Sequence, residues 1–202
     1  MDNLKVSENS KIKDIADLEH NGHIMFASQD KQTLPYIIEL ANFSKNDCVK
    51  LAESILHEPS KIKTDFLSNN LKGYPVLVVQ TAQLLNQFKG LELETYKRKI
   101  LESSDKIKLN ISVAISKLSP SAVELLYQIS LINNQSFSKD FLKYIAGNKS
   151  NIEDDIYQIS KFSLITNIDA NTKNPVFEMH DIIMQTILEM MGRDKAKSIL
   201  EK

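Results

Sequence analysis

Residues 151–181 decide the expected fold, because a helical pattern and two strand-like runs follow one another in NIEDDIYQISKFSLITNIDANTKNPVFEMHD. Three isoleucines and a phenylalanine recur at helical spacing between residues 152 and 162. The apolar runs 164–168 and 176–179 flank a segment of turn-forming residues, which is typical of a β-hairpin loop. The stretch therefore predicts a helix followed by a two-stranded hairpin.

Two more helices are expected just upstream of this stretch. Ser119 and Pro120 supply an N-cap and a first-turn proline for a helix that reaches about Leu131. Ser138 caps a shorter helix, for which Gly147 is the stop. Three helices followed by a hairpin is the order of a winged helix-turn-helix domain.

The pattern closer to the N-terminus predicts a separate helical domain. Ser44 and Asp47 form a capping-box-like start for a helix that ends near residue 56. A second helix ends at Gly73, where a left-handed terminator is expected, and a third helix begins at Pro75. A fourth helix precedes the polar break at residues 103–105. The domain boundary is expected at this break.

The predicted fold class is mainly α, a small helical bundle followed by a winged-helix domain with a short β-hairpin. The apolar run at residues 23–27 adds one expected N-terminal strand. The expected parts are a polar N-terminal segment that holds this strand (1–34), the helical domain (35–105), the winged-helix domain (106–192) and a charged tail (193–202).

The composition of the 202 residues excludes several classes of protein. A formal net charge of -1 argues against a basic nucleic-acid or membrane surface, so we expect neither partner. The single cysteine excludes an internal disulfide and a cysteine-based zinc site. No stretch approaches the apolar length of a membrane span, and the first residues lack a signal-peptide core. These features predict a cytoplasmic protein, and the frequent Asn, Ser, Lys and Ile weakly favour a bacterial source.

No catalytic constellation stands out in the sequence. The chain contains neither a phosphate-binding P-loop motif nor a Gly-x-Ser-x-Gly elbow. The pair Asp154 and Asp155 lies in a polar helix start and is interpreted as a cap in a solvated turn. Cys48 lies on the apolar face of its helix and is interpreted as a small core residue. We therefore expect no catalytic residue and no free-standing enzyme.

The histidines give no metal site either. His20 and His23 lie three residues apart, a spacing that suits metal ligands on a helix. Gly22 and the strand expected from His23 onward argue against such a helix. His57 follows a helix end, where a cation suits the helix dipole. We expect no metal ion.

Three short stretches, in this order, resemble motifs of the NB-ARC or STAND class of signal-transduction ATPases. Residues 23–29 resemble the strand that closes the nucleotide-binding domain, residues 71–77 resemble the Gly-Leu-Pro-Leu-Ala motif, and residues 177–181 contain Met-His-Asp. Ser119 to Leu131 resembles the family's first winged-helix segment, and Leu164 and Ile165 resemble its Ser-Leu-Leu strand. The resemblance covers residues 23 to about 192.

The resemblance implies two regulatory arms, helical and winged-helix, without the nucleotide-binding body. In the family the proline packs near the adenine and the histidine reaches the ADP β-phosphate, which implies ADP contacts for Gly73, Pro75 and His180. A complete parent would use ADP or ATP with magnesium, whereas this chain alone would hold no cofactor. Gln29 stands where the family usually has an arginine, so sensing of the γ-phosphate is not implied here.

Simpler interpretations of the same residues stay open. Gly73 and Pro75 are explained as a helix stop and a helix start, and His180 could cap the last helix while Asp181 favours its dipole. The expected function is a regulatory module whose partner is a nucleotide-binding domain of the same parent or of another protein. The alternatives are a winged-helix DNA-binding regulator and a helical protein-interaction scaffold or effector module.

Overall fold

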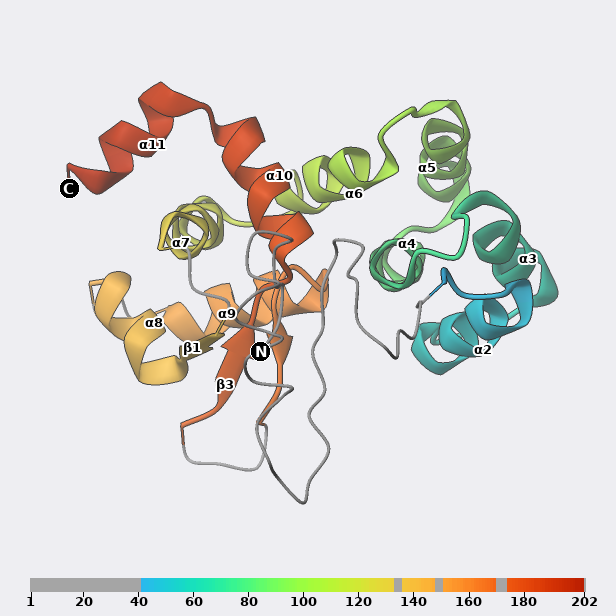
Figure 1. The fold of residues 1–202 in the computed structure, drawn as a ribbon, viewed down its shortest axis with the longest axis horizontal. Helices are drawn as coiled ribbons and strands as arrows, with labels where there is room; N and C mark the ends of the chain where they lie inside the picture. The colour runs from blue at the N-terminus through green and yellow to red at the C-terminus, as the bar shows by residue number, and fades with distance from the viewer. Residues whose placement is uncertain (1–40, 133–135, 148–150, 170–173, 202) are drawn as a thin grey trace, which may run out of the picture. The chain divides into compact units, whose positions relative to one another are not determined.

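The computed structural model describes residues 41–132, 136–147, 151–169 and 174–201. Within them it contains ten helices and one three-stranded antiparallel sheet, which confirms the expected mainly α fold (Figure 1). Asn42–Lys202 forms one compact unit, inside which the expected boundary near residue 105 stays a prediction. The expected strand at 23–27, the histidines His20 and His23, and Gln29 lie outside the described residues.

The first four described helices follow the expected order, and the starts of α2 and α4 are the ones that the sequence predicts. They are α2 (Lys45–Ile55), α3 (Lys61–Asn70), α4 (Pro75–Gln87) and α5 (Gly90–Glu102). At the start of α2, Ser44 Oγ accepts a hydrogen bond from the Asp47 amide, and the Asp47 carboxylate accepts one from the Ser44 amide. This capping box is the expected one, and it fixes where α2 begins.

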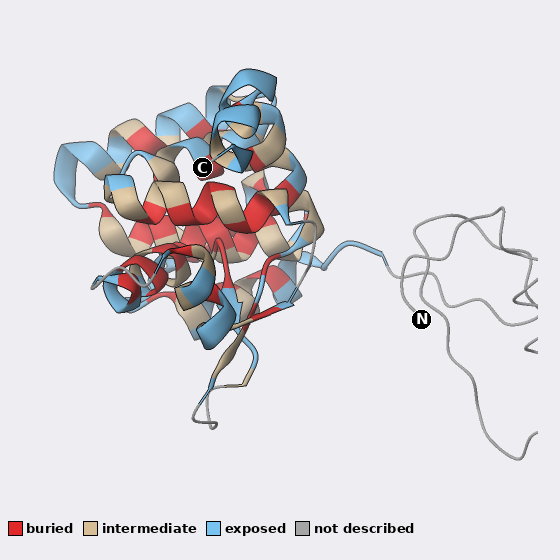
Figure 2. Cartoon of the chain, turned by 90° about the vertical axis from the view of Figure 1, so that its left-hand side faces the viewer, coloured by how far each residue is buried: buried red, intermediate tan, exposed pale blue. Residues whose placement is uncertain are grey.

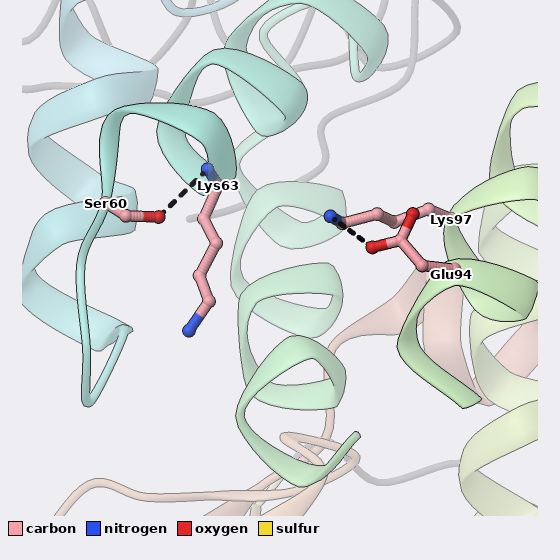
Figure 3. Close-up of polar contacts among 4 residues, drawn as sticks. All are labelled: Ser60, Lys63, Glu94 and Lys97. Carbon is pink, nitrogen blue, oxygen red and sulfur yellow. Dashed lines mark hydrogen bonds and ion pairs between the residues drawn. The ribbon is translucent and has the colours of Figure 1, made fainter. Parts of the chain in front are cut away.

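Figure 3 shows two further local contacts that support these helices. At the start of α3, the Ser60 hydroxyl accepts a hydrogen bond of 3.4 Å from the Lys63 amide. On α5, Lys97 and Glu94 form an ion pair of 3.0 Å one turn apart. An exposed pair of this kind contributes at most about 0.5 kcal/mol, so the burial of apolar side chains stabilises these helices more.

Packing of α4 against α2, α3 and α6 builds the core of this half. Helix α4 is apolar on most sides, and seven of its thirteen residues are buried. A buried polar chain also joins three helices: the Tyr96 hydroxyl donates to Asn110 Oδ1 at 2.7 Å, and Asn110 Nδ2 donates to Thr81 Oγ1 at 2.9 Å. These bonds fix α5 and α4 to α6 (Lys106–Ile115), because an unpaired polar group would be costly in this core.

The second half has the expected order of helices and one strand that the sequence pattern does not predict. The order is α7 (Pro120–Leu131), β1 (Ser136–Ser138), α8 (Lys139–Ile145), α9 (Ile152–Lys161), β2 (Thr166–Asn167) and β3 (Val176–Glu178). The hairpin forms as expected between β2 and β3, with Asn167 opposite Phe177. The added strand β1 lies on the other side of β3, where Phe137 is opposite Phe177.

Two helices end the chain where the sequence predicts one helix and a charged tail. Helix α10 (Asp181–Met191) ends at Gly192, which has a left-handed φ of 73°. The tail is helical too, because α11 (Arg193–Leu200) packs on α7 and α10. Lys195 places its ammonium group 4.4 Å from the ring centre of Tyr127 on α7. A cation over an aromatic ring explains how so polar a segment is held.

Buried residues of both halves belong to one hydrophobic cluster that runs from Cys48 to Met191. In Figure 2 the buried positions lie on the inward sides of the helices, and exposed positions cover the outer sides. None of the helices in the described part is long and apolar enough to cross a membrane.

Candidate functional site

A tight elbow joins α3 to α4 within residues 71–77, the second of the three stretches that resemble a family motif. We call residues Lys72, Gly73 and Tyr74 the elbow. Lys72 has a φ of 52° and Gly73 a φ of 74°, so the chain reverses through two successive left-handed residues. Left-handed backbone costs a residue with a Cβ about 1 kcal/mol, a strain that Lys72 carries. The expected helix terminator at Gly73 is thereby confirmed.

Glycine is also the only residue type that fits at position 73. A Cβ built on it would lie 2.2 Å from the backbone oxygen of Phe43, well inside the closest approach of real atoms. The Phe43 amide donates a hydrogen bond of 2.9 Å to the Gly73 oxygen, and Asn42 Nδ2 donates one of 3.1 Å to the Lys72 oxygen. The segment before α2 therefore lies directly against the elbow.

Pro75 is the first residue of α4, as the sequence predicts. Its fixed φ suits the first helical position, and its missing N–H would have had no partner within the helix. No side chain caps this helix, since Tyr74 is the N-cap residue and forms no side-chain hydrogen bond to it. Pro75 therefore has a structural role here whether or not it contacts a ligand.

His180 lies at the corner between β3 and α10. It is exposed, and it is the N-cap residue of α10, where its Nδ1 accepts a hydrogen bond of 3.3 Å from the Ile182 amide. Asp181 follows in the first turn, where a negative charge favours the helix dipole. The capping interpretation of His180 is thus confirmed, and its side chain still reaches the surface.

A groove of about 430 Å³ opens beside the elbow. The side chains that line it come from the elbow and the adjoining helix ends, from the start of α6 and from the start of α10: Asn70, Leu71, Lys72, Tyr74, Leu77, Ser104, Asp105, Lys106, Ile107 and Ile182. Lys72 and Lys106 bring positive charge to it, Asp105 brings negative charge, and Tyr74 is 49% exposed. Its volume lies within the roughly 300–1,000 Å³ that is usual for small-molecule sites.

The three residues for which ADP contacts are implied lie around this groove but do not line it. Gly73 stands between two lining residues, Lys72 and Tyr74, whereas His180 precedes the lining residue Ile182 by two positions. The groove is therefore lined by part of the stretch 71–77 and by Ile182, which directly follows the stretch 177–181. Of the two lining lysines, Lys72 lies within the stretch 71–77, whereas Lys106 lies outside all three motif-like stretches and has no signal in the sequence.

The interpretation of Asp155 as part of a solvated turn is wrong. Its side chain is buried at 2% exposure, while Asp154 beside it is exposed. Asp155 Oδ1 accepts hydrogen bonds from Ser121 Oγ at 2.7 Å and from Ser119 Oγ at 3.1 Å. The carboxylate therefore lies at the N-terminal end of α7, beside the N-cap residue Ser119, where the helix dipole also favours a negative charge.

The side chain of Asn151 extends this network of hydrogen bonds between α7 and α9. Asn151 is the N-cap residue of α9 but forms no side-chain cap bond, and its Nδ2 donates to Ser121 Oγ at 3.1 Å. From the next turn of α9, Gln158 Oε1 accepts a bond of 2.8 Å from the Ser119 amide. The polar residues at the start of α9 thus hold α9 against α7 and are not all directed to solvent.

Acidic Glu153 on α9 is neutralised by two lysines of α8. Lys139 Nζ lies 2.7 Å and Lys143 Nζ 3.6 Å from Glu153 Oε1. The hydrogen bond from Lys139 lowers the pKa of the Glu153 carboxyl below its usual range. The face formed by α8 and α9 is therefore close to neutral rather than acidic.

Other candidate residues are structural. Cys48 is fully buried on α2, which confirms the core interpretation, and burial raises the pKa of its thiol. His57 follows the end of α2 and is exposed, as expected. Among the described residues, His, Cys, Asp and Glu side chains nowhere gather in threes as a metal site would require.

Comparison with known proteins adds no relative. No protein-family model matches the chain, and a search of curated proteins found no match either.

Proposed function

We propose that this chain is a non-catalytic regulatory module of an NB-ARC or STAND-like ATPase, which helps to hold an ADP-bound closed state and gates self-assembly. The observation that carries the proposal is the groove beside the elbow. It is lined on one side by Lys72, Tyr74 and Leu77 and on another by Ile182. The first side belongs to the stretch 71–77 that resembles a family motif, and Ile182 directly follows the stretch 177–181 that contains Met-His-Asp.

The chemistry of the groove suits one side of a nucleotide. Lys72 and Lys106 outnumber the one lining acid, Asp105, so the net positive charge attracts phosphate, and the exposed Tyr74 offers a ring for a base. The chain has no P-loop, whose amides and lysine supply most of the phosphate affinity in such proteins. The phosphates would be held by a nucleotide-binding domain of a longer parent or of another protein.

The order of elements in the second half supports a winged-helix arm. A helix, a strand, two helices and two further strands follow each other as α7, β1, α8, α9, β2 and β3. The same order favours a second candidate, a DNA-binding regulator that would insert α9 into the major groove. The charge on this face argues against it, because Lys139 and Lys143 are occupied by Glu153 and Asp154 adds an exposed acid.

The test is a titration of the chain with ADP and, separately, with AMP, followed by the methyl NMR signals of Ile107 and Ile182. Both residues line the groove. Without a P-loop we expect weak binding, with a Kd of roughly 0.1–10 mM, and shifts confined to the groove. ADP should bind a few times more tightly than AMP, because only ADP has the β-phosphate that His180 is proposed to contact.

A pair of histidine variants makes this test specific. His180→Ala should remove the preference for ADP over AMP, whereas His57→Ala, at another exposed histidine, should keep it. Absence of any shift at high ADP concentration would refute the nucleotide part of the proposal. Sub-micromolar binding by this chain alone would also contradict it, since the phosphate-binding elements are proposed to lie elsewhere.

A further inference from the structure

Two hydrogen bonds join the segment before α2 to the elbow. The Phe43 amide donates to the Gly73 oxygen at 2.9 Å, and Asn42 Nδ2 donates to the Lys72 oxygen at 3.1 Å. We call this pair of bonds the clamp. Its two halves are 30 residues apart in the sequence, so the clamp is a tertiary contact and not part of either helix.

The clamp and the elbow are shaped for each other. The backbone oxygen of Phe43 occupies the space that a Cβ on Gly73 would need, and its amide nitrogen lies 3.0 Å from the same point. The elbow is also strained, because Lys72 adopts a left-handed φ of 52° without being a glycine. A strained backbone persists only where its surroundings hold it, and here the clamp supplies two of the holding bonds.

The conformation of the elbow sets the shape of the groove. Lys72 and Tyr74 line it directly, and Leu77 lines it from the first turn of α4. A change in the backbone of Gly73 would move the two side chains that flank it. The groove is therefore coupled to the seating of Asn42 and Phe43 on the elbow.

The clamp can open without unfolding α2. The two donor residues, Asn42 and Phe43, are exposed, and Phe43 is 42% accessible. Little buried surface therefore opposes their release. The start of α2 is fixed separately by the capping box of Ser44 and Asp47. The clamp is thus a small, weakly held contact between two firmly folded elements.

We propose that the clamp is a conformational switch for the groove: with Asn42 and Phe43 seated the groove keeps its shape, and their release lets the elbow relax and the groove change. The biological role that this inference gives to the groove rests on the proposed function. Any pull on the chain where it enters α2 would then be transmitted to Lys72 and Tyr74. The switch would regulate ligand contact at that site.

The test compares two glycine variants of the full chain. Gly73→Ala places a Cβ against Phe43, whereas Gly192→Ala has nearly the same φ, 73° against 74°, with no atom within 4 Å of its Cβ. Hydrogen exchange at the Phe43 amide reports the clamp, and the methyl signals of Ile107 and Ile182 report the groove. Ile156, a buried residue of α9, serves as a distant reference.

We expect Gly73→Ala to speed exchange at the Phe43 amide at least ~10-fold and to shift both groove methyl signals, with Ile156 unchanged. Gly192→Ala should leave all of them as in the unaltered chain. If Gly73→Ala does not fold, Asn42→Ala decides: loss of the bond to the Lys72 oxygen should give smaller changes in the same direction.

Faster exchange at the Phe43 amide without any shift at Ile107 and Ile182 would show that the clamp is not coupled to the groove. Unchanged exchange at the Phe43 amide would show that the close approach of Phe43 to Gly73 does not hold the clamp. Equal effects of Gly73→Ala and Gly192→Ala would show that left-handed backbone, and not the close approach, is responsible. No nucleotide is present in this experiment. Its failure is therefore distinct from failure of the ADP titration.

Discussion

The hydroxyl of Ser121 donates a hydrogen bond of 2.7 Å to the buried carboxylate of Asp155 and so fixes the start of α7 to α9. Ser119 adds a second bond to the same oxygen at 3.1 Å. A buried charge is tolerated only when its surroundings supply such donors. This relationship explains why an acidic residue stands on the inner side of α9.

Asp155→Ala should therefore lower the free energy of unfolding by about 1–3 kcal/mol, because it removes the acceptor of two serine hydroxyls. Asp154→Ala is the matched control at the exposed neighbour, where we expect a change within about 0.5 kcal/mol. Urea unfolding followed by circular dichroism measures both. Equal effects of the two variants would mean that the network contributes nothing specific.

Local signals in the sequence predicted the helices well. The roles of Ser44, Pro75 and Gly147 at helix ends depend only on residues a few positions away in the sequence. Each of the three stands at the helix end that was expected for it. Strand β1 was missed because three residues show no periodicity, and β1 exists only through its pairing with β3. The helix α11 was missed for a similar reason, since it depends on contact with α7.

The candidate site was predictable only in part. The motifs drew attention to Gly73, Pro75 and His180, and the structure assigns each of them a local structural role. The groove itself depends on how α6 and α10 pack beside the elbow, which no local pattern encodes. The close approach of Phe43 to Gly73 is likewise invisible in the sequence, where a positive φ alone explains the glycine.

His180→Ala should change the free energy of unfolding by no more than about 0.5 kcal/mol. The side chain is exposed, and its bond to the Ile182 amide is long at 3.3 Å, so the cap that it forms is weak. Thermal unfolding of the variant measures this directly.

In a complete parent protein, the same substitution should make activation easier, because it weakens the closed ADP state. A loss of more than about 1.5 kcal/mol would instead identify His180 as a residue needed for folding.

DNA binding should be weak and without sequence preference, with a Kd above ~1 µM at ~150 mM salt. The reason is the near-neutral face of α8 and α9, where Glu153 pairs with Lys139 and Lys143. A mobility-shift assay with random and selected duplexes measures this. Glu153→Ala frees both lysines and should strengthen binding, mainly at low salt. Nanomolar, sequence-dependent binding by the unaltered chain would make the DNA-binding regulator the better function.

The alkaline limit of stability should depend on Tyr96. Its hydroxyl is buried and donates to Asn110, and burial raises the pKa of Tyr96 well above its usual value near 10. Above about pH 10 the unfolded chain therefore releases a proton that the folded chain keeps. The stabilising effect of this group is complete below that pH and declines as the pH rises, by up to about 1.4 kcal/mol per pH unit.

Tyr96→Phe tests this dependence, because it removes the ionisable group and keeps the ring that packs on Phe88 at 5.1 Å between centroids. At neutral pH the variant should be less stable by about 1–2 kcal/mol, since Asn110 loses a buried partner. Between about pH 9 and 11 its stability should fall less steeply than that of the unaltered chain. Tyr144→Phe, at a side chain that is 78% exposed, should retain the original slope in urea unfolding at each pH. If Tyr96→Phe and the unaltered chain lose stability in parallel as the pH rises, the Tyr96 hydroxyl is not the group that limits folding in alkali.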